Sequence, residues 1–267
     1  GDRLTLTTAS GPMRLRVDRL WPGPAGLVGR GTAFSVAAAN RTRPAYAGIE
    51  GLDAEIAAVH DMVELPLARP DLFERLGVEP PRGVLFTGPP GSGKTLLARA
   101  IAQQTEAAFF HLAGPEIVSK HYGESERALR EVFDAAAKRA PAIVFLDEID
   151  AIAPRREGLS GEKQVERRVV GQLLTLLDGL APRDRVVVIA ATNLPDSLDP
   201  ALRRPGRLER EISFRPPGPD ARARILALHL ARAPLAAGVD LPAVAARCHG
   251  HVGADLAALA REAGLAA

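Results

Sequence analysis

The chain has 267 residues, of which 46% are hydrophobic and 25% charged, and its net charge is +2. These proportions are ordinary for a globular protein, and the near balance of charges argues against a nucleic-acid partner. A lone cysteine, Cys248, excludes an internal disulfide, and no run approaches the roughly 18 apolar residues of a membrane span, so we expect a cytoplasmic protein with neither a nucleic-acid nor a membrane partner.

The first 45 residues differ in character from the rest of the chain. Residues 13–17 alternate between apolar and polar side chains, and residues 27–28 and 32–36 are short β-like runs between Pro and Gly turns. So few strands form a module that is too small to fold alone. We therefore predict a short β segment here, followed by a linker at residues 40–44.

The next informative segment is a phosphate-binding pattern. Residues 83–87 form an apolar run typical of a buried parallel strand, and the run Gly88-Pro-Pro-Gly-Ser-Gly-Lys94-Thr95 after it fits G-x-x-x-x-G-K-[ST]. Its glycines allow a tight loop whose N–H groups point at an anion, and the positive end of the following helix faces the same anion. Lys94 would reach the β and γ phosphates, and the Thr95 hydroxyl would hold Mg²⁺. The alternative is a glycine-rich turn without a ligand.

A second core strand, at residues 142–146, ends in two acids, Asp147 and Glu148. Open α/β sheets bind ligands at the carboxyl ends of their strands. Adjacent residues on a strand point in different directions, so one acid can face the metal while the other faces water. We assign Asp147 to Mg²⁺ through its water shell and Glu148 to the attacking water as general base. The alternative is a pair of solvated acids.

Two further catalytic candidates follow the strand at residues 186–191. Asn193 stands at its tip and would align the attacking water, because this strand is expected to lie beside the one that carries Glu148. The alternative is an asparagine that begins a turn. Farther along, Arg204 and Arg207 flank a Pro-Gly turn, and they would act as arginine fingers if they face a neighbouring subunit's γ-phosphate.

The alternation of strands and helices from residue 46 to 215 predicts a parallel sheet with helices on both faces. We predict strands at 83–87, 108–112, 142–146, 186–191 and 211–214, and helices at 52–65, 93–104, 123–139, 164–178 and 199–203. After a Pro-rich break, helices at 220–230, 241–248 and 253–262 predict a small helical subdomain. The helical pattern is cut at the last residue, so we expect a fragment of a longer protein. His229 lies on an apolar helix face, where a packed core histidine is the default interpretation.

With these residues in view, the chain resembles the AAA family of ring-forming ATPases, and within it the first ATPase module of the valosin-containing-protein branch. The matching stretches are residues 62–66, 80–84, 88–95, 119–128, 143–153, 166–174, 191–193, 199–207 and 249–256. Residues 13–38 resemble the tail of that family's N-terminal adaptor-binding domain. The resemblance implies an N-terminal tail and linker over 1–45, a P-loop ATPase subdomain with a five-stranded parallel sheet over 46–215, and a truncated helical subdomain over 216–267.

The resemblance also implies a hexameric ring that binds ATP and Mg²⁺ between subunits and unfolds, segregates or remodels proteins, with adaptor proteins as further partners. It places His229 near the ribose and base, which reverses the interpretation of a packed core histidine. The residues that would contact the nucleotide are Pro90, Gly91, Ser92, Gly93, Lys94, Thr95, Leu96, Asn193 and His229, with Ile49, Gly51, Gly253 and Ala254 around the adenine.

Other segments match features of the assembled ring. Arg204 and Arg207 match the fingers that act across the subunit boundary, and Asp178-Gly179 matches a segment that relays nucleotide state. The central-pore loop that grips a polypeptide is matched by Lys120, His121, Tyr122 and Gly123. The chain departs from the family at His121, where an aromatic or aliphatic residue is usual, and at Leu208, where Phe is usual. Residues 158–165 are about two residues longer than expected, which puts the second pore loop in doubt.

Three other functions fit parts of the pattern. A nucleic-acid-dependent motor of the same superfamily would need basic tracks, and the balanced charge argues against it. A non-catalytic module that uses ATP only to hold an assembly together would not need the catalytic residues that this chain carries. A monomeric switch GTPase would need an Asn-Lys-x-Asp run, which the chain lacks. An ATPase that acts on proteins is therefore the favoured hypothesis.

Overall fold

The computed structural model describes residues 3–8, 11–16, 44–118, 124–155, 164–180, 185–236 and 238–266. The chain divides into two compact units, residues 1–43 and residues 44–267. In the first unit, β1 (Arg3–Thr8) and β2 (Gly11–Arg16) pair antiparallel as a hairpin. β2 overlaps the strand-like run predicted at 13–17, whereas β1 was not predicted. The runs at 27–28 and 32–36 lie outside the described residues.

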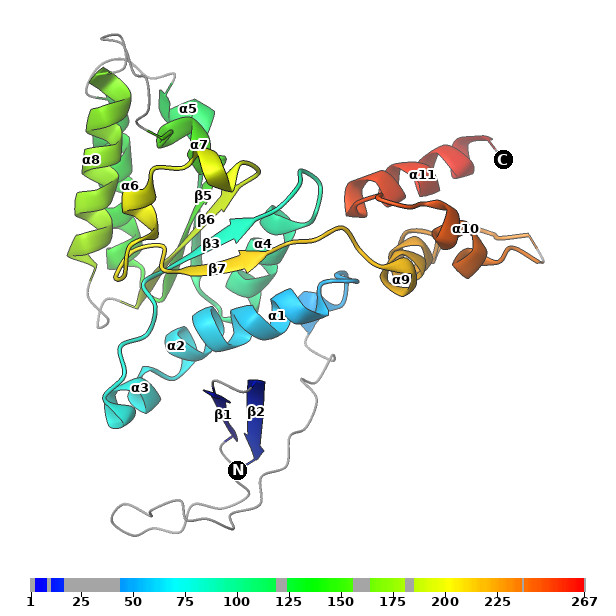
Figure 1. The fold of residues 1–267 in the computed structure, drawn as a ribbon, viewed down its shortest axis with the longest axis horizontal. Coiled ribbons are helices and arrows are strands. Elements are labelled where there is room, and N and C mark those ends of the chain that lie inside the picture. The colour runs from blue at the N-terminus through cyan, green and yellow to red at the C-terminus, as the bar shows by residue number, and fades with distance from the viewer. Residues whose placement is uncertain are drawn as a thin grey trace. The chain divides into compact units, whose positions relative to one another are not determined.

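The second unit is built on a five-stranded sheet in which all neighbouring strands are parallel, as predicted (Figure 1). The strand order is β4-β5-β6-β3-β7. The strands are β3 (Gly83–Thr87), β4 (Ala108–Ala113), β5 (Ala142–Asp147), β6 (Val186–Thr192) and β7 (Arg210–Ser213). Because β5 and β6 are neighbours, the two acids and Asn193 come to the same edge of the sheet, which confirms the expected adjacency of these strands.

Helices cover both faces of the sheet, because its central strands are apolar on both sides. Phe145 packs with α4 (Lys94–Gln104) and α1 (Asp53–Val59) on one face. Val144 and Leu146, its neighbours on β5, pack with α6 (Glu124–Lys138) and α8 (Gln164–Gly179) on the other. Figure 1 shows α6 and α8 on one side of the sheet and α1 and α4 on the other. This arrangement is the predicted α/β fold.

The structure corrects several predicted boundaries. The helix expected at 52–65 continues to residue 68 as α1, a π-helical turn η2 (His60–Glu64) and α2 (Leu65–Ala68). The segment predicted as a helix at 199–203 is a 3-10 turn, η6 (Pro200–Arg203), whose first N–H groups include that of Ala201, which donates to the Asp199 carboxylate at 2.9 Å. The unpredicted helices α3 (Pro70–Leu76), α5 (Gly114–Val118) and α7 (Ile149–Ile152), and the 3-10 turns η1 (Pro44–Tyr46) and η5 (Pro195–Ser197), are too short to show a helical period.

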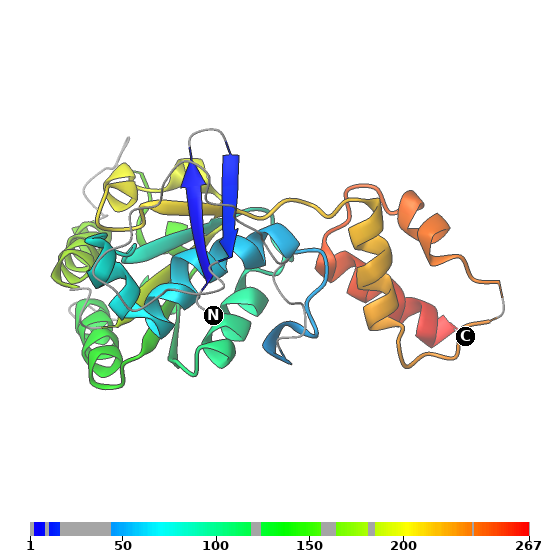
Figure 2. The same cartoon turned by 90° about the horizontal axis from the view of Figure 1, so that it is seen from below.

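After β7 the chain forms a compact group of three helices, α9 (Pro219–His229), α10 (Leu241–Arg247) and α11 (Gly253–Ala266), as Figure 2 shows. Their small core contains Ile225, Leu226, Ala245, Cys248 and Leu256. The buried Arg222 guanidinium donates to the carbonyls of Ala245 and Pro217 at 2.8 and 2.9 Å, which ties α9 to α10. Among the described residues, none of the helices is long and apolar enough to cross a membrane.

Candidate functional site

A cavity of about 480 Å³ lies between the carboxyl edge of the sheet and two of the C-terminal helices, α9 and α11. That volume falls in the usual range for small-molecule sites. The cavity brings together every residue predicted to contact a nucleotide, although their binding role stays a prediction. Its lining residues are Gly48, Ile49, Glu50, Gly51, Leu52, Pro90, Gly91, Ser92, Gly93, Lys94, Thr95, Leu96, Asp147, Glu148, Asn193, Arg215, Pro217, Ile225, Leu228, His229, Gly253, Ala254 and Ala257.

The loop between β3 and α4 requires glycine at two crowded positions. Gly88 has φ +141°, and a Cβ there would lie 2.2 Å from the carbonyl oxygen of Phe214. Gly91 has φ +73°, and its Cβ would lie 2.7 Å from the Cβ of Ala254. The loop can therefore approach both the end of β7 and the start of α11 only because it has no side chains at these points. The Ala254 N–H donates to the Gly91 carbonyl at 3.2 Å, which joins the loop to α11.

The Lys94 ammonium is buried in this loop and satisfied by oxygens. Its Nζ donates to the carbonyls of Gly88 and Pro89 and to Oδ1 of Asn193, each at 2.8 Å. Burial lowers the pKa of Lys94, and the charges of Asp147 and Asp150 oppose that shift. The contact with Asn193 spans the two central strands and places this amide beside the phosphate-binding loop.

Thr95 and Asp147 form an oxygen-rich pair at the same edge. The Thr95 hydroxyl donates to Oδ2 of Asp147 at 2.9 Å, and Oδ1 of Asp147 accepts the Glu148 N–H at 3.0 Å. Hydroxyl and carboxylate oxygens are the donors that Mg²⁺ prefers, so the pair fits the predicted ion. Among the described residues there is no cluster of three or more His, Cys, Asp or Glu side chains that could hold a metal alone. An ion here would therefore need further oxygens from its ligand or from water.

Glu148 lies exposed on the cavity wall, one residue beyond the end of β5. Its backbone is left-handed, with φ 51° and ψ 49°, and it caps α7. We predicted that alternation along the strand would separate the two acids, but only Asp147 belongs to β5, and Glu148 lies beyond the strand with this different backbone conformation. The left-handed conformation is uncommon for a residue with a side chain, and such positions cluster at functional sites.

The other end of the cavity is mainly apolar. Ile49 and Gly51, which precede α1, line it together with Ile225 and Leu228 of α9 and Ala254 of α11. His229, at the end of α9, is exposed and lines the same space. The default interpretation of His229 as a packed core residue is therefore wrong. The residues of α9 that enter the small core, Ile225 and Leu226, come before His229 in the helix.

An ion-pair bridge joins α9 to the segment that precedes and begins α1. The Arg224 guanidinium donates through Nε to Glu50 Oε2 at 2.9 Å and through a terminal nitrogen to Asp53 Oδ2 at 2.8 Å. Glu50 itself lines the cavity. The bridge thus connects the apolar end of the cavity to the C-terminal helices through one arginine, a feature that we did not predict.

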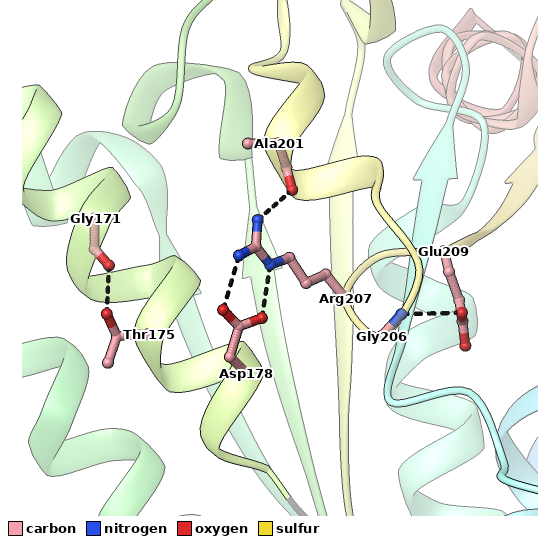
Figure 3. Close-up of polar contacts among 7 residues, drawn as sticks. All are labelled: Gly171, Thr175, Asp178, Ala201, Gly206, Arg207 and Glu209. Atoms are coloured by element: carbon pink, nitrogen blue, oxygen red, sulfur yellow. Dashed lines mark hydrogen bonds and ion pairs between the residues drawn. The ribbon is translucent and has the colours of Figure 1, made fainter.

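The predicted arginine fingers lie outside this cavity. The Arg207 guanidinium forms two 2.7 Å contacts with the carboxylate of Asp178, in the last turn of α8, and donates to the Ala201 carbonyl at 2.7 Å (Figure 3). Hydrogen bonding to Arg207 lowers the pKa of Asp178. Arg204 is exposed. Neither arginine is among the described residues that line the cavity.

Comparison with known protein families decides the class to which the site belongs. The family model described as "ATPase family associated with various cellular activities (AAA)" matches residues 84–216, and that of the AAA+ lid domain matches residues 238–267. The chain belongs to the AAA family of ATPases. The C-terminal helices α10 and α11 fall within the lid match, so the cavity lies between the AAA domain and its lid.

Archaeal AAA proteins are among the relatives of the chain. It is 56% identical to the Cell division cycle protein 48 homolog of Archaeoglobus fulgidus over 220 residues, which are 82% of this chain and 30% of that protein. It is 55% identical to Protein CdcH of Halobacterium salinarum over 222 residues, 83% of this chain and 30% of that protein. It is 56% identical to Protein SAV of Sulfolobus acidocaldarius over 207 residues, 78% of this chain and 26% of that protein. The chain thus spans less than a third of the length of these curated relatives.

The predicted pore-loop residues of this AAA domain, Lys120, His121, Tyr122 and Gly123, lie outside the described residues, as does most of the lengthened segment at 158–165. Sequence reasoning missed two polar groups near the cavity. Asp150 accepts a hydrogen bond from the Thr192 hydroxyl at 2.5 Å, and His111 lies 3.8 Å from Asp147. Their positions beside motif residues are visible only once neighbouring strands and turns are placed.

Proposed function

We propose that this AAA domain hydrolyses ATP with Mg²⁺ in a hexameric ring of identical chains, and that turnover unfolds, segregates or remodels protein substrates. The observation that carries the proposal is the division of charged groups in the structure. Lys94, Thr95, Asp147, Glu148 and Asn193 converge on one cavity, whereas the finger arginines lie outside it. Arg215 is the one arginine among the described residues that line the cavity, and we propose that the two finger arginines reach it from a second chain.

Binding would begin at the loop between β3 and α4. Lys94 already donates hydrogen bonds to three oxygens. A triphosphate would accept some of these hydrogen bonds in their place, because its oxygens carry more negative charge. Thr95 and Asp147 would hold Mg²⁺, which neutralises charge on the phosphates when it is bound. The apolar end near Ile49 and Ile225 would enclose the base, with His229 at its margin.

The proposed chemistry assigns two residues to water. Glu148 is exposed to the cavity and acts as the general base, which takes a proton from the attacking water. Asn193 aligns that water, and its contact with Lys94 keeps the amide close to the position of the phosphates. Arg204 and Arg207 of the adjacent chain stabilise the charge that develops on the γ-phosphate.

The contact between chains in such a ring is head-to-tail, so each chain offers two different surfaces. One surface carries the cavity, and the other carries the turn with Arg204 and Arg207. Residues 120–123 would contact protein substrates in the central pore, and adaptor proteins would select them. Both of these roles come from the family resemblance, and both stay proposals for this chain.

A mixing experiment tests whether the arginines act in trans. A chain with Arg204→Ala and Arg207→Ala keeps an intact cavity, and a chain with Glu148→Gln keeps intact arginines. Either variant alone is expected to lose ATP hydrolysis by about 10²-fold or more. Mixed rings restore hydrolysis at the seams where an intact Glu148 meets intact arginines, so turnover should rise well above the sum of the two separate preparations.

The control for the mixing experiment is the double arginine variant alone, at the same total protein concentrations as the mixtures. It should stay inactive at each concentration.

Protein remodelling is tested on the wild-type ring by unfolding of a fluorescent substrate protein, with and without ATP. If the double arginine variant hydrolyses ATP normally as a dilute monomer, the shared site is refuted.

A further inference from the structure

His111 occupies an unusual position next to the proposed cation site. It lies on β4, which pairs with β5 so that His111 stands beside Phe145 and Ala113 stands beside Asp147. The Nε2 atom of His111 is 3.8 Å from Oδ2 of Asp147. The side chain is 35% exposed, so it is not a buried histidine that serves only the core.

Aromatic stacking restrains the His111 ring. Its centroid lies 5.6 Å from that of Phe145, with an interplanar angle of 27°, and 6.5 Å from that of Phe109, with an angle of 18°. Phe109 and Phe145 belong to the core on the face that α4 covers. A stacked ring cannot turn freely, so the nitrogen that faces Asp147 is held in place.

The contacts of Asp147 show what a third neighbour would add. One carboxylate oxygen, Oδ1, is fixed by the Glu148 N–H. The other, Oδ2, accepts from Thr95, which is itself the proposed Mg²⁺ ligand. When the Thr95 oxygen binds a cation, its contact with Asp147 must adjust. Within the part of the chain that the structure describes, His111 is then the remaining side chain within ion-pair distance of Oδ2.

We propose that His111 is a positioning residue for the cation site, which holds the Asp147 carboxylate in the orientation that receives Mg²⁺. Partners of this kind orient metal-binding carboxylates, and their loss typically weakens metal affinity by about 10- to 100-fold. The inference rests on the proposed nucleotide site, because Mg²⁺ arrives there with the nucleotide. Its measurable consequence is the coupling between Mg²⁺ and nucleotide binding, which needs no turnover.

The test compares wild type with His111→Leu and His111→Gln. Each protein is titrated with a fluorescent, non-hydrolysable ATP analogue, once with excess Mg²⁺ and once with EDTA. The dissociation constant in EDTA divided by that in Mg²⁺ measures the coupling. We expect His111→Leu to reduce this ratio about tenfold, while the dissociation constant in EDTA stays within twofold of wild type. Gln places a polar nitrogen near the position of Nε2, so His111→Gln should restore most of the ratio.

Two controls complete the design. His249→Gln changes an exposed histidine outside the cavity and should leave the ratio unchanged. Equal ratios in wild type and His111→Leu would refute the proposal, and so would equal losses in the Leu and Gln variants, since those indicate aromatic packing alone. Weaker binding in EDTA for His111→Leu would also refute it, because the defect would then lie in the cavity. If wild type itself fails to bind the analogue, the proposed function fails instead.

Discussion

The loop that carries Lys94 and the turn that carries Arg207 both hold a cation, but in different surroundings. Lys94 is 7% exposed, its ammonium donates to three oxygens at 2.8 Å at the cavity edge, and burial lowers its pKa. Arg207 is partly buried, and the hydrogen bond to the exposed carboxylate of Asp178 raises its pKa. The lysine is therefore held at the cavity of its own chain, whereas the arginine is held outside the cavity by one exposed acid and the Ala201 carbonyl.

Among the substitutions considered, the largest loss of activity is expected at Glu148, which lines the same cavity as Lys94. Glu148→Gln removes the proposed base but keeps the size of the side chain, so kcat for ATP hydrolysis should fall about 10²- to 10⁴-fold. Nucleotide affinity should change little, because Lys94 and Thr95 are untouched. Glu106→Gln, at an exposed glutamate away from the cavity, is the matched control. Single-turnover hydrolysis at the wild-type rate in the Glu148 variant would remove this residue from the mechanism.

A smaller effect is expected where the lid meets the cavity. Arg224→Ala breaks the bridge to Glu50 and Asp53, so the lid is held less firmly and nucleotide affinity should fall about two- to fivefold, the range for a partly exposed pair. The charge swap that combines Arg224→Glu with Glu50→Arg should recover part of the loss. Arg232→Ala, at an exposed arginine after α9, should have no effect in the same calorimetric titration.

The smallest effect is expected at the arginine turn. Asp178→Asn removes the charge that holds Arg207, and because Asp178 is 53% exposed the loss of unfolding free energy should be about 1 kcal/mol at most. The folded-state pKa of Asp178 is lowered, so its contribution is present above the unfolded pKa and disappears as pH falls through the folded value. Urea unfolding should therefore give the same difference between variant and wild type at pH 5 and pH 8.

Asp134→Asn, at an exposed aspartate on α6, is the control for that measurement. A difference that grew steadily between pH 5 and pH 8 would contradict the assignment, since both pKa values of Asp178 lie below this window. In ATPase assays of the ring, Asp178→Asn also asks whether freeing Arg207 affects the neighbouring site. A change in the rate of ATP hydrolysis would show that the contact between Asp178 and Arg207 influences the neighbouring site.

Much of the fold could be predicted because its signals are local. The strands at 83–87, 142–146 and 186–191 are almost entirely apolar, since a central parallel strand is buried on both faces. The longer helices, such as α6 and α8, repeat their apolar residues often enough to be recognised. The short helices α3, α5 and α7 escaped prediction because they contain too few turns to show a period.

The candidate site was predicted less evenly. The phosphate-binding loop and the two acids follow a motif, so they could be named from their spacing. His111 and Arg224 belong to no motif. Nothing near them in the sequence indicates that they contact Asp147 and Glu50. The helical pattern misjudged His229 as a core residue, because a pattern alone cannot tell a face that meets a core from one that meets a cavity, whereas the family resemblance placed this histidine near the nucleotide.

By itself, the sequence determined the order of the sheet strands and the longer helices along the chain and the chemical types at the phosphate-binding loop, because these depend on residues that are near one another in the chain. Only the tertiary structure decided which side chains meet. Lys94 contacts Asn193 from 99 residues away, Arg207 contacts Asp178 from 29, and Arg224 contacts Glu50 from 174. Such contacts depend on how strands order themselves in the sheet and how the lid packs, and a one-dimensional pattern does not contain that information.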